Sequence, residues 1–344
     1  MPNVVNVDGL TRASRVYNNV LRELPYFMLN QTCKNLRINI IAVKGEDILI
    51  SKRRKAGLLR PYKPGLTLGN NPELMKFYEA KLKPEETYAE VNDNILNYKE
   101  KKIISNQGEM IDNKSKKHPL ELMILTDVVK SVSEDVIFAL FFAERDDDVA
   151  SPSTAFTGFF SKIDLLTVAG EISEENGNLK TTGEFKLPVH GADYTSYKKL
   201  VEFVKSAHPL LKQGEVLLYA AENPINCARM AYWKMTKSYQ YPSTEEMLTK
   251  LRSDANAPGL KLVTDIALGT GDRLLLQKPG LLDLGVNNES DKDYVQVRNP
   301  YKDPNEVQFW VQASYDTRIN DVHEKLFQTN EQTNTSVNYA GDYV

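Results

Sequence analysis

PLELMILTDVVKSVSEDVIFALFFAER, residues 119–145, is the longest amphipathic stretch of the chain. Its apolar residues recur at three- and four-residue steps, which predicts a helix with one buried face. That face comprises Leu122, Leu125, Val129, Val132, Val136, Ala139, Leu140 and Ala143. Pro119 suits a first helical turn, and the run Asp146, Asp147, Asp148 marks a hydrated end. A helix over 119–146 would be about 40 Å long, more than most small domains need.

The segment before this helix is polar and rich in loops. Residues 36–50 (LRINIIAVKGEDILI) predict two strands around a Lys-Gly-Glu-Asp turn. Residues 60–74 (RPYKPGLTLGNNPEL) exclude a regular helix or a central strand. We expect a short helix at 74–82 and a long exposed strand region at 87–104. A loop-rich segment of this length in a compact domain needs a reason, and a projecting functional loop is one.

The two ends of the chain are expected to differ from the rest. Residues 1–10 lack periodicity and are expected to be an arm, followed by a helix at 11–24 that Pro25 ends. The polar run from Gln328 onward predicts a flexible tail. Before that tail, residues 294–297 and 307–315 predict a pair of strands.

Between residues 194 and 290 helices and strands alternate, which is typical of an α/β domain. The helices are expected at 194–207, 223–237 and 244–252, and the strands at 215–220, 260–265 and 273–277.

Charge is unevenly distributed. Up to His118 the chain carries 21 Lys and Arg against 13 Asp and Glu, whereas the remainder carries 22 against 33. The basic residues include the cluster Lys52, Arg53, Arg54 and Lys55. Contact between the basic part of one copy and the acidic part of another would be electrostatically complementary. The alternative is that these charged side chains lie on exposed faces and are only solvated by water.

Residues able to perform catalysis do not converge in this sequence. The four histidines, His118, His190, His208 and His323, show no metal-ligand spacing, and no nucleophile elbow or Walker A loop occurs. The nearest phosphate-loop candidate, Gly269–Arg273 in LGTGDR, precedes a strand instead of a helix, so we expect a hairpin turn with glycines at positive φ. No catalytic residue, cofactor-binding residue or metal ligand is assigned.

Cys33 and Cys227 are expected to be buried free thiols, because cytosolic chains rarely keep disulfides. The longest apolar run, residues 136–143, is too short to span a bilayer. The N-terminus lacks a basic region followed by an apolar one, so synthesis in a cytoplasm is expected.

The order of these parts over residues 12–327 resembles the tailed-bacteriophage major capsid proteins of the Hong Kong 97 fold, to which the encapsulins are related. The resemblance implies an α+β chain with an N-terminal arm, an extended loop, a long spine helix, a peripheral domain and an α/β axial domain. It places these parts as follows: arm and helix 1–30, extended loop and flanking strands 31–118, peripheral domain 119–190 with spine helix 119–146, axial domain 191–290, returning strands 291–327 and tail 328–344.

Two local stretches add to the resemblance. KPGLLDLGVNN, residues 278–288, is similar to a segment that precedes the last strands in that family. Asp283 lies near the polar position of that segment, and Leu284 and Gly285 match it. VQFWVQASYDTRINDVHEKLF, residues 307–327, resembles the closing strand and its polar turn. The chain departs from the pattern in having no scaffolding segment ahead of the arm, which implies a separate scaffolding protein. No maturation protease site or Lys–Asn crosslink can be assigned.

The resemblance implies a virion structural protein that assembles, in the host bacterial cytoplasm, into an icosahedral shell around double-stranded DNA. Its partners would be other copies in hexamers and pentamers, scaffolding, portal and decoration proteins, and DNA contacted without sequence specificity; no membrane and no cofactor are implied. The extended loop would cross the spine helix of a neighbouring copy. The candidate contact residues are Lys52, Arg53, Arg54 and Arg60 with Asp146, Asp147 and Asp148.

Three alternatives stay open. An encapsulin-like nanocompartment would use the same fold around protein cargo. Another phage head protein, associated with the portal or decorating the shell, is the second. The third is an enzyme that binds a nucleotide at Gly269–Arg273.

Overall fold

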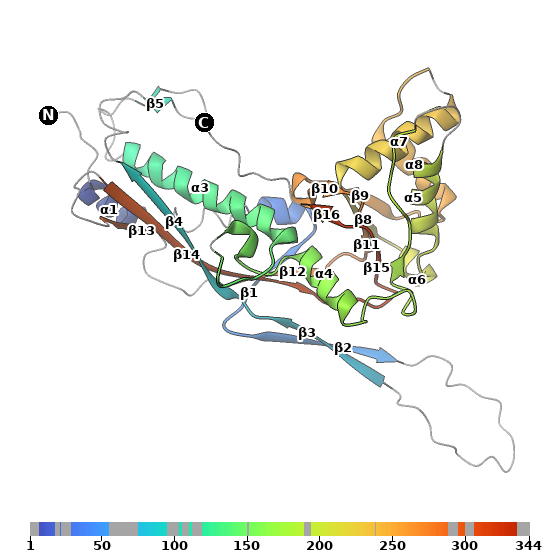
Figure 1. The fold of residues 1–344 in the computed structure, drawn as a ribbon, viewed down its shortest axis with the longest axis horizontal. Helices are drawn as coiled ribbons and strands as arrows, with labels where there is room; N and C mark the ends of the chain where they lie inside the picture. The colour runs from blue at the N-terminus through green and yellow to red at the C-terminus, as the bar shows by residue number, and fades with distance from the viewer. Residues whose placement is uncertain are drawn as a thin grey trace, which may run out of the picture.

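The helix predicted from residue 119 is α3 (Pro119–Phe142), which lies along one lobe of the molecule (Figure 1). Its 24 residues correspond to about 36 Å. The predicted apolar face is buried except for Leu122, which is half-buried. The helix ends before residue 146 because the chain folds back, so that the Gly158 N–H donates to the Ala143 carbonyl at 2.7 Å.

The computed structural model describes most of the chain and leaves several segments undescribed. The described residues are 7–17, 21, 29–54, 75–94, 103–104, 110–111, 119–149, 151–188, 194–237, 239–287, 295–299 and 306–335. Arg60, the tip between the predicted strands, and the ends of the chain lie outside them.

A five-stranded sheet packs against α3 and forms the peripheral lobe. Its strands are β1 (Asn39–Ala42), β12 (Leu282–Val286), β14 (Glu306–Ile319), β13 (Val295–Arg298) and β4 (Glu85–Asn94). They pair in the order β1-β12-β14-β13, and β4 pairs with β14 over ten residues. Alternate β14 residues Val307, Phe309 and Val311 are buried against α3 and α1 (Val7–Val16). The predicted strand pair at 294–315 is therefore β13 with β14.

A second sheet forms the axial lobe, seen beyond the far end of α3 in Figure 1. Its order is β7 (Leu179–Lys180), β15 (Phe327–Asn330), β11 (Leu274–Gln277), β8 (Val216–Ala220) and β9 (Leu260–Val263). One face packs on a core with α5 (Thr195–Lys205), α7 (Glu222–Thr236), α8 (Thr244–Asp254) and the short α6 (Pro209–Lys212). The other face packs on α4 (Phe159–Val168) and the end of α3.

Two antiparallel strands, β2 (Asp47–Arg54) and β3 (Met75–Leu82), form a ribbon that projects from the body (Figure 1). We call β2 and β3 together the ribbon. The remaining strands pair as β5 (Ile103–Ile104) with β6 (Met110–Ile111), and β10 (Thr270–Gly271) with β16 (Asn334–Thr335). Residues 29–35 are helical, and short 3-10 turns occur at Pro152–Thr154 and Ile266–Leu268.

Two predictions near the N-terminus were wrong. The first helix is α1, which begins at Val7 within the predicted arm, because Leu10 and Ala13 are buried against α3. The predicted helix at 74–82 is strand β3, in which Tyr78, Ala80 and Leu82 lie on the body side at every second position.

Two predictions near the C-terminus were also wrong. Residues 328–335 are not a flexible tail, because Gln328, Thr329 and Asn330 are buried in β15 and the following residues contribute to β16. The LGTGD stretch is not a hairpin turn, because β8 lies between β9 and β11 in the axial sheet. The glycines do have positive φ, as expected: Gly269 at 66° and Gly271 at 143°.

Candidate assembly interface

The ribbon exposes apolar side chains on its outward face. Residues directly opposite each other in the register share a face, so Ile50 lies beside Glu79. Phe77, which is opposite Lys52 two pairs further on, occupies the same face. Ile48, Ile50 and Phe77 are 48%, 54% and 58% exposed. Large apolar side chains gathered on a projecting element mark an interaction surface more often than a solvated one.

The inward face of the ribbon is attached to the body near its root. Ala80 and Leu82 are buried, and Tyr78 packs against the core beneath the peripheral sheet. The Ser51 hydroxyl donates to the Asn320 carbonyl at 3.4 Å. A two-stranded ribbon is marginal in water by itself, so the outward apolar face favours a partner that covers it.

The predicted basic contact residues lie on this ribbon. Lys52, Arg53 and Arg54 are consecutive in the distal half of β2, where Arg54 pairs with Met75 in the strand register. The structure thus brings three of the four together on one projecting strand. The fourth, Arg60, lies outside the described residues.

The predicted acidic contact residues follow α3 and face solvent. Asp147 accepts from Arg145 Nε at 2.6 Å, and the Asp148 N–H donates to Asp146 Oδ1 at 2.9 Å. The three aspartates are exposed. They lie on a different element from the ribbon.

A second acidic group, which the sequence interpretation missed, lies on the exposed side of α3. Asp127, Glu134 and Asp135 are exposed along this helix, with Lys130 beside Asp127 at 4.0 Å. Desolvation by the surrounding protein, with a smaller contribution from Glu134, raises the pKa of Asp135. A cation placed there would favour the charged carboxylate. The helical period that predicted the buried face also predicts this stripe, since it occupies the opposite positions.

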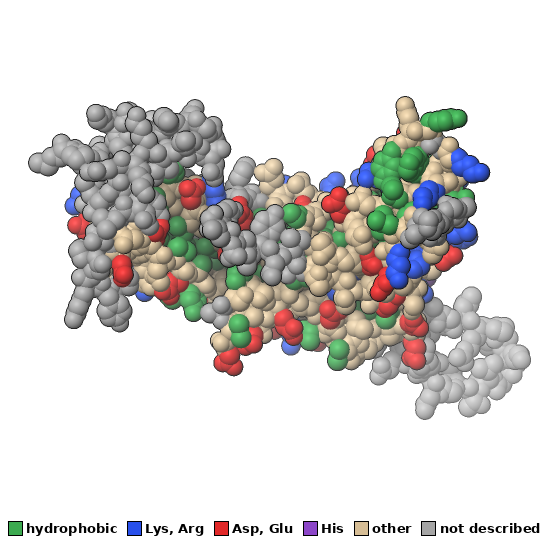
Figure 2. All heavy atoms as spheres, turned by 45° about the horizontal axis from the view of Figure 1, so that its top comes forward, with side chains coloured by type: hydrophobic (Ala, Val, Ile, Leu, Met, Phe, Trp, Pro, Cys, Tyr) green, Lys and Arg blue, Asp and Glu red, His purple; other side chains and the backbone are tan. Residues whose placement is uncertain are grey.

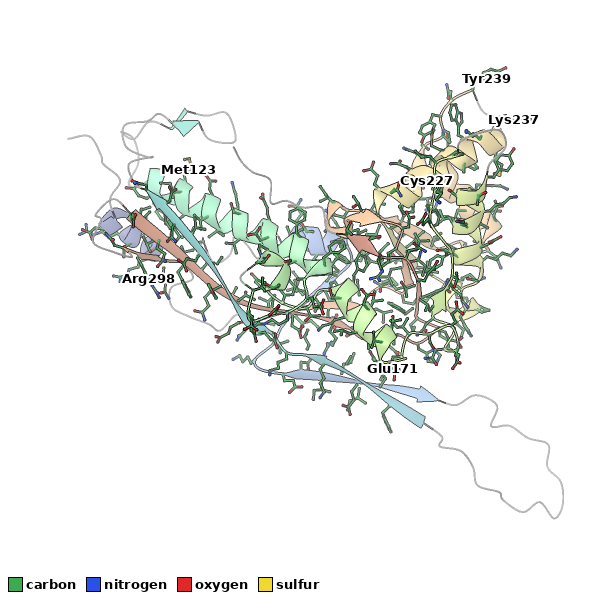
Figure 3. All side chains as sticks on the ribbon, viewed as in Figure 1. Met123, Glu171, Cys227, Lys237, Tyr239 and Arg298 are labelled. Atoms are coloured by element: carbon green, nitrogen blue, oxygen red, sulfur yellow. The ribbon has the colours of Figure 1, made fainter. Side chains whose placement is uncertain are left out.

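The outer end of the axial lobe carries a separate aromatic cluster. Tyr241 lies edge-on to Trp233 with ring centroids 5.5 Å apart, and the Arg229 guanidinium lies 4.7 Å from the Tyr241 ring centroid. Tyr239 is fully exposed and projects beyond α7 together with Lys237 (Figure 3). Figure 2 shows apolar side chains gathered over this end among basic ones.

The Gly269–Arg273 stretch does not form an open phosphate loop. A Cβ on Gly269 would lie 2.2 Å from the Thr335 carbonyl oxygen, and one on Gly271 would lie 2.5 Å from Asn334 Oδ1. The Arg273 side chain is buried, donates to the Gln332 carbonyl at 2.8 Å and pairs with Asp164. Strand β16 therefore fills the space that a nucleotide phosphate would need.

Metal-binding and membrane-spanning features are absent from the described ranges. In those ranges no group of three or more His, Cys, Asp or Glu side chains is arranged to hold a metal ion. His208 and His323 each accept a backbone N–H two residues ahead, which is a role in turns. None of the described helices is long and apolar enough to cross a bilayer. Both cysteines are free and buried, as predicted.

Comparison with known proteins gives a match at the level of structure alone. No protein-family profile matches the chain, and neither does any curated protein sequence. A chain of the satellite phage P4 procapsid, a particle including the size determination (Sid) protein, aligns with a TM-score of 0.52 and 13% identity over 89% of this chain and 90% of that one. A chain from the capsid of an empty GTA particle aligns with a TM-score of 0.52 and 9% identity over 86% and 94%. The chain has the capsid-protein fold.

This capsid fold confirms the predicted α+β class and the resemblance from which it came.

Proposed function

We propose that this protein is the major capsid subunit of a tailed phage, which assembles into an icosahedral shell around double-stranded DNA. The observation that carries the proposal is the ribbon, whose outward face presents Ile48, Ile50 and Phe77 with nothing of its own chain over them among the described residues. A second copy of the chain would cover this face. The role is structural instead of catalytic, in keeping with the capsid and procapsid chains that share the fold.

The ribbon is proposed to lie across α3 of a neighbouring copy. Its distal strand carries Lys52, Arg53 and Arg54, and the exposed side of α3 carries Asp127, Glu134 and Asp135. Opposite charges on the two surfaces favour this pairing over contact between two ribbons. Asp146, Asp147 and Asp148, with Arg60 opposite, extend the same contact beyond the end of α3. Each exposed pair contributes only about 0–1 kcal/mol, so many repeated contacts are needed.

Head-to-tail contacts of this kind close into rings, and rings close into a shell. The aromatic end of the axial lobe, with Tyr239 and Tyr241, is proposed to meet its equivalents at ring centres in pentamers and hexamers. The proposed division of labour keeps 31–118 as the extended loop with its flanking strands, 119–190 as the peripheral part and 191–290 as the axial part, completed by strands 291–327. Residues 1–30 are proposed to be the arm and its helix.

The proposed assembly takes place in the host bacterial cytoplasm with a separate scaffolding protein, and portal and decoration proteins complete the head. Packaged DNA is contacted without sequence specificity, because a chain with a net charge of −3 neutralises few phosphates. No cofactor takes part.

The test is electron microscopy and light scattering of the purified chain, alone and with the scaffolding protein of its phage. Closed shells or sheets of one repeating unit are expected. Phe77→Asp should abolish them while the thermal unfolding temperature stays unchanged, because Phe77 is exposed in the single subunit. Phe77→Leu, which keeps an apolar side chain, is the matched control and should assemble. Assembly by Phe77→Asp equal to the wild type would count against the proposed contact.

A charge test addresses the pairing with α3. Arg53→Glu with Arg54→Glu should reduce shell formation, and adding Glu134→Lys with Asp135→Lys to the same chain should restore it, because every reversed ribbon then meets a reversed α3. Normal assembly of the first variant would contradict the charge contact. The content of the particles separates a phage shell from an encapsulin-like compartment: nucleic acid supports the proposal, and an enclosed enzyme supports the alternative.

A further inference from the structure

Three neighbouring strands of the peripheral sheet place one polar residue each in a single row. Asn39 on β1 pairs in register with Asp283 on β12, and Asp283 pairs with Arg318 on β14. Asn39 Nδ2 donates to Asp283 Oδ1 at 3.0 Å, and Arg318 Nη2 donates to Asp283 Oδ2 at 2.8 Å. Both side chains of the ion pair are buried, at 4% exposed for Arg318 and 3% for Asp283.

The row continues from Arg318 to the root of the ribbon. Arg318 Nη1 donates to Asp47 Oδ2 at 2.7 Å, and Arg318 Nε donates to Asn320 Oδ1 at 2.9 Å. Asp47 is the first residue of β2, and its side chain is half exposed. Burial alone would lower the pKa of Arg318, but the hydrogen bonds to Asp283 and Asp47 outweigh it and raise the pKa. Arg318 therefore stays charged and joins a fixed carboxylate to one on the ribbon.

The other strand of the ribbon is held at the same level. Leu82 is the register partner of Asp47 and is fully buried. It lies against Gly285 on β12, where a Cβ would come within 2.8 Å of Leu82 Cγ. Gly285 is two residues beyond Asp283, so one strand supports both members of the first ribbon pair. The next backbone N–H, of Lys83, donates to Asp316 Oδ2 at 2.8 Å.

We propose that Asp283, Gly285 and Arg318 form a seat that sets the direction in which the ribbon leaves the body, and that this direction decides whether copies close into shells of one size. The inference rests on the proposed function and deepens it, because it assigns positioning residues to the ribbon contact. It also supplies a physical role for the Leu282–Gly285 stretch noted in the sequence, since a carboxylate and a residue without a side chain are each needed at this place.

The experiment measures the direction of the ribbon independently of assembly. Spin labels are attached at Glu79→Cys on the ribbon and Val168→Cys on α4, and the distance distribution between them is measured by pulsed electron paramagnetic resonance on the unassembled chain. Both introduced sites are exposed, whereas the native thiols are buried. Asp47→Ala removes the ribbon carboxylate that Arg318 of the seat holds, and it leaves the Asp283–Arg318 pair intact. Glu46→Ala, which removes an exposed carboxylate one residue away, is the matched control, and Asp47→Glu tests rescue.

A broadened distance distribution and the loss of most uniform closed shells are expected for Asp47→Ala, with only a small fall in the thermal transition because Asp47 is half exposed. Glu46→Ala should behave as the wild type, and Asp47→Glu should restore both readouts in part. Two results would overturn the proposal: a distribution for Asp47→Ala identical to that of Glu46→Ala, or a broadened distribution with uniform shells. If the wild type forms no repeating assembly, the proposed function fails, and an unchanged distance distribution remains a separate refutation of the seat.

Discussion

The rings of Tyr88 and Trp310 lie parallel within 3°, with centroids 4.7 Å apart, on the outer face of the peripheral sheet. The two residues are diagonal neighbours, because Tyr88 pairs with Gln312 and Trp310 pairs with Glu90. The Arg298 guanidinium lies 5.2 Å from the Trp310 ring centroid (Figure 3 labels Arg298). One stack thus joins β4, β14 and β13 on the face opposite α3.

Tyr88→Ala should therefore destabilise the subunit by about 1 kcal/mol, the usual contribution of a stacked cross-strand aromatic pair. Urea unfolding followed by circular dichroism measures the change. Gln312→Ala, at the position directly opposite Tyr88, is the control and should change the free energy of unfolding by less. Equal losses for the two variants would mean that the stack adds nothing beyond ordinary surface contact.

Gly285→Ala should destabilise the subunit by about 1–3 kcal/mol, because the added methyl group overlaps Leu82. The same substitution in a Leu82→Ala background should cost much less, since the space is then free. Denaturant unfolding of the four proteins in a double-mutant cycle gives the coupling energy. Additive losses would show that the close approach of β3 to β12 is not what requires glycine.

Arg273→Ala should cost roughly 1–3 kcal/mol, because the buried guanidinium donates to the Gln332 carbonyl and lies 5.1 Å from the Phe160 ring centroid. Asp164→Asn should cost less than about 1 kcal/mol, because Asp164 is largely exposed. Thermal and urea unfolding of both variants measure which substitution causes the larger loss of unfolding free energy. A larger loss for Asp164→Asn would mean that the ion pair, not the buried contacts, ties α4 to the axial lobe.

Both thiols should resist modification in the folded chain at pH 8. Cys33 and Cys227 are buried, and desolvation raises the pKa of the Cys33 thiol to about 12. The reactive thiolate is therefore almost absent at that pH. Titration with a chromogenic disulfide should give no fast-reacting thiol in buffer and two in denaturant. Rapid reaction in buffer would show that one cysteine is reached through local opening.

Periodicity correctly predicted the elements in which the buried residues follow a single regular spacing. The buried side of α3 and the all-apolar strand β8 could be predicted because their apolar residues match a single period. β3 could not, since its alternation of Tyr78, Ala80 and Leu82 with charged residues competes with the helix propensity of MKFYEAKL. Pairing with β2 decides the outcome, and pairing is a long-range contact.

Composition misled at β15, where polar residues lie in the core. Asn330 Oδ1 accepts from the Leu274 N–H at 2.8 Å, and Asn330 Nδ2 donates to the Asp272 carbonyl at 2.8 Å. Gln328 Nε2 donates to the Phe203 carbonyl at 2.8 Å. Polar side chains can be buried when such partners are present, and partners from distant strands leave no local signal in the sequence.

The candidate contact could be predicted only in part. The basic cluster from Lys52 to Arg54 was visible as a run of charges, and the structure places it on a projecting strand. The apolar face of the ribbon could not be predicted from the sequence. Phe77 shares a face with Ile48 and Ile50 only through the register that pairs Phe77 with Lys52. The exposed position of the acidic residues on α3 can be predicted from the helical period, but only after the buried face of the helix has been assigned.

Strand β15 lies between β7 and β11, and β1 pairs with β12 across more than two hundred residues of chain. Neither sheet can close until nearly all of these residues have left the ribosome. Such a high contact order predicts slow folding, since distant segments must meet before their contacts stabilise anything. We expect the supply of completed subunits to rise gradually after synthesis. Slow release of subunits favours the growth of started shells over the start of new ones, so folding speed itself would limit the number of incomplete particles.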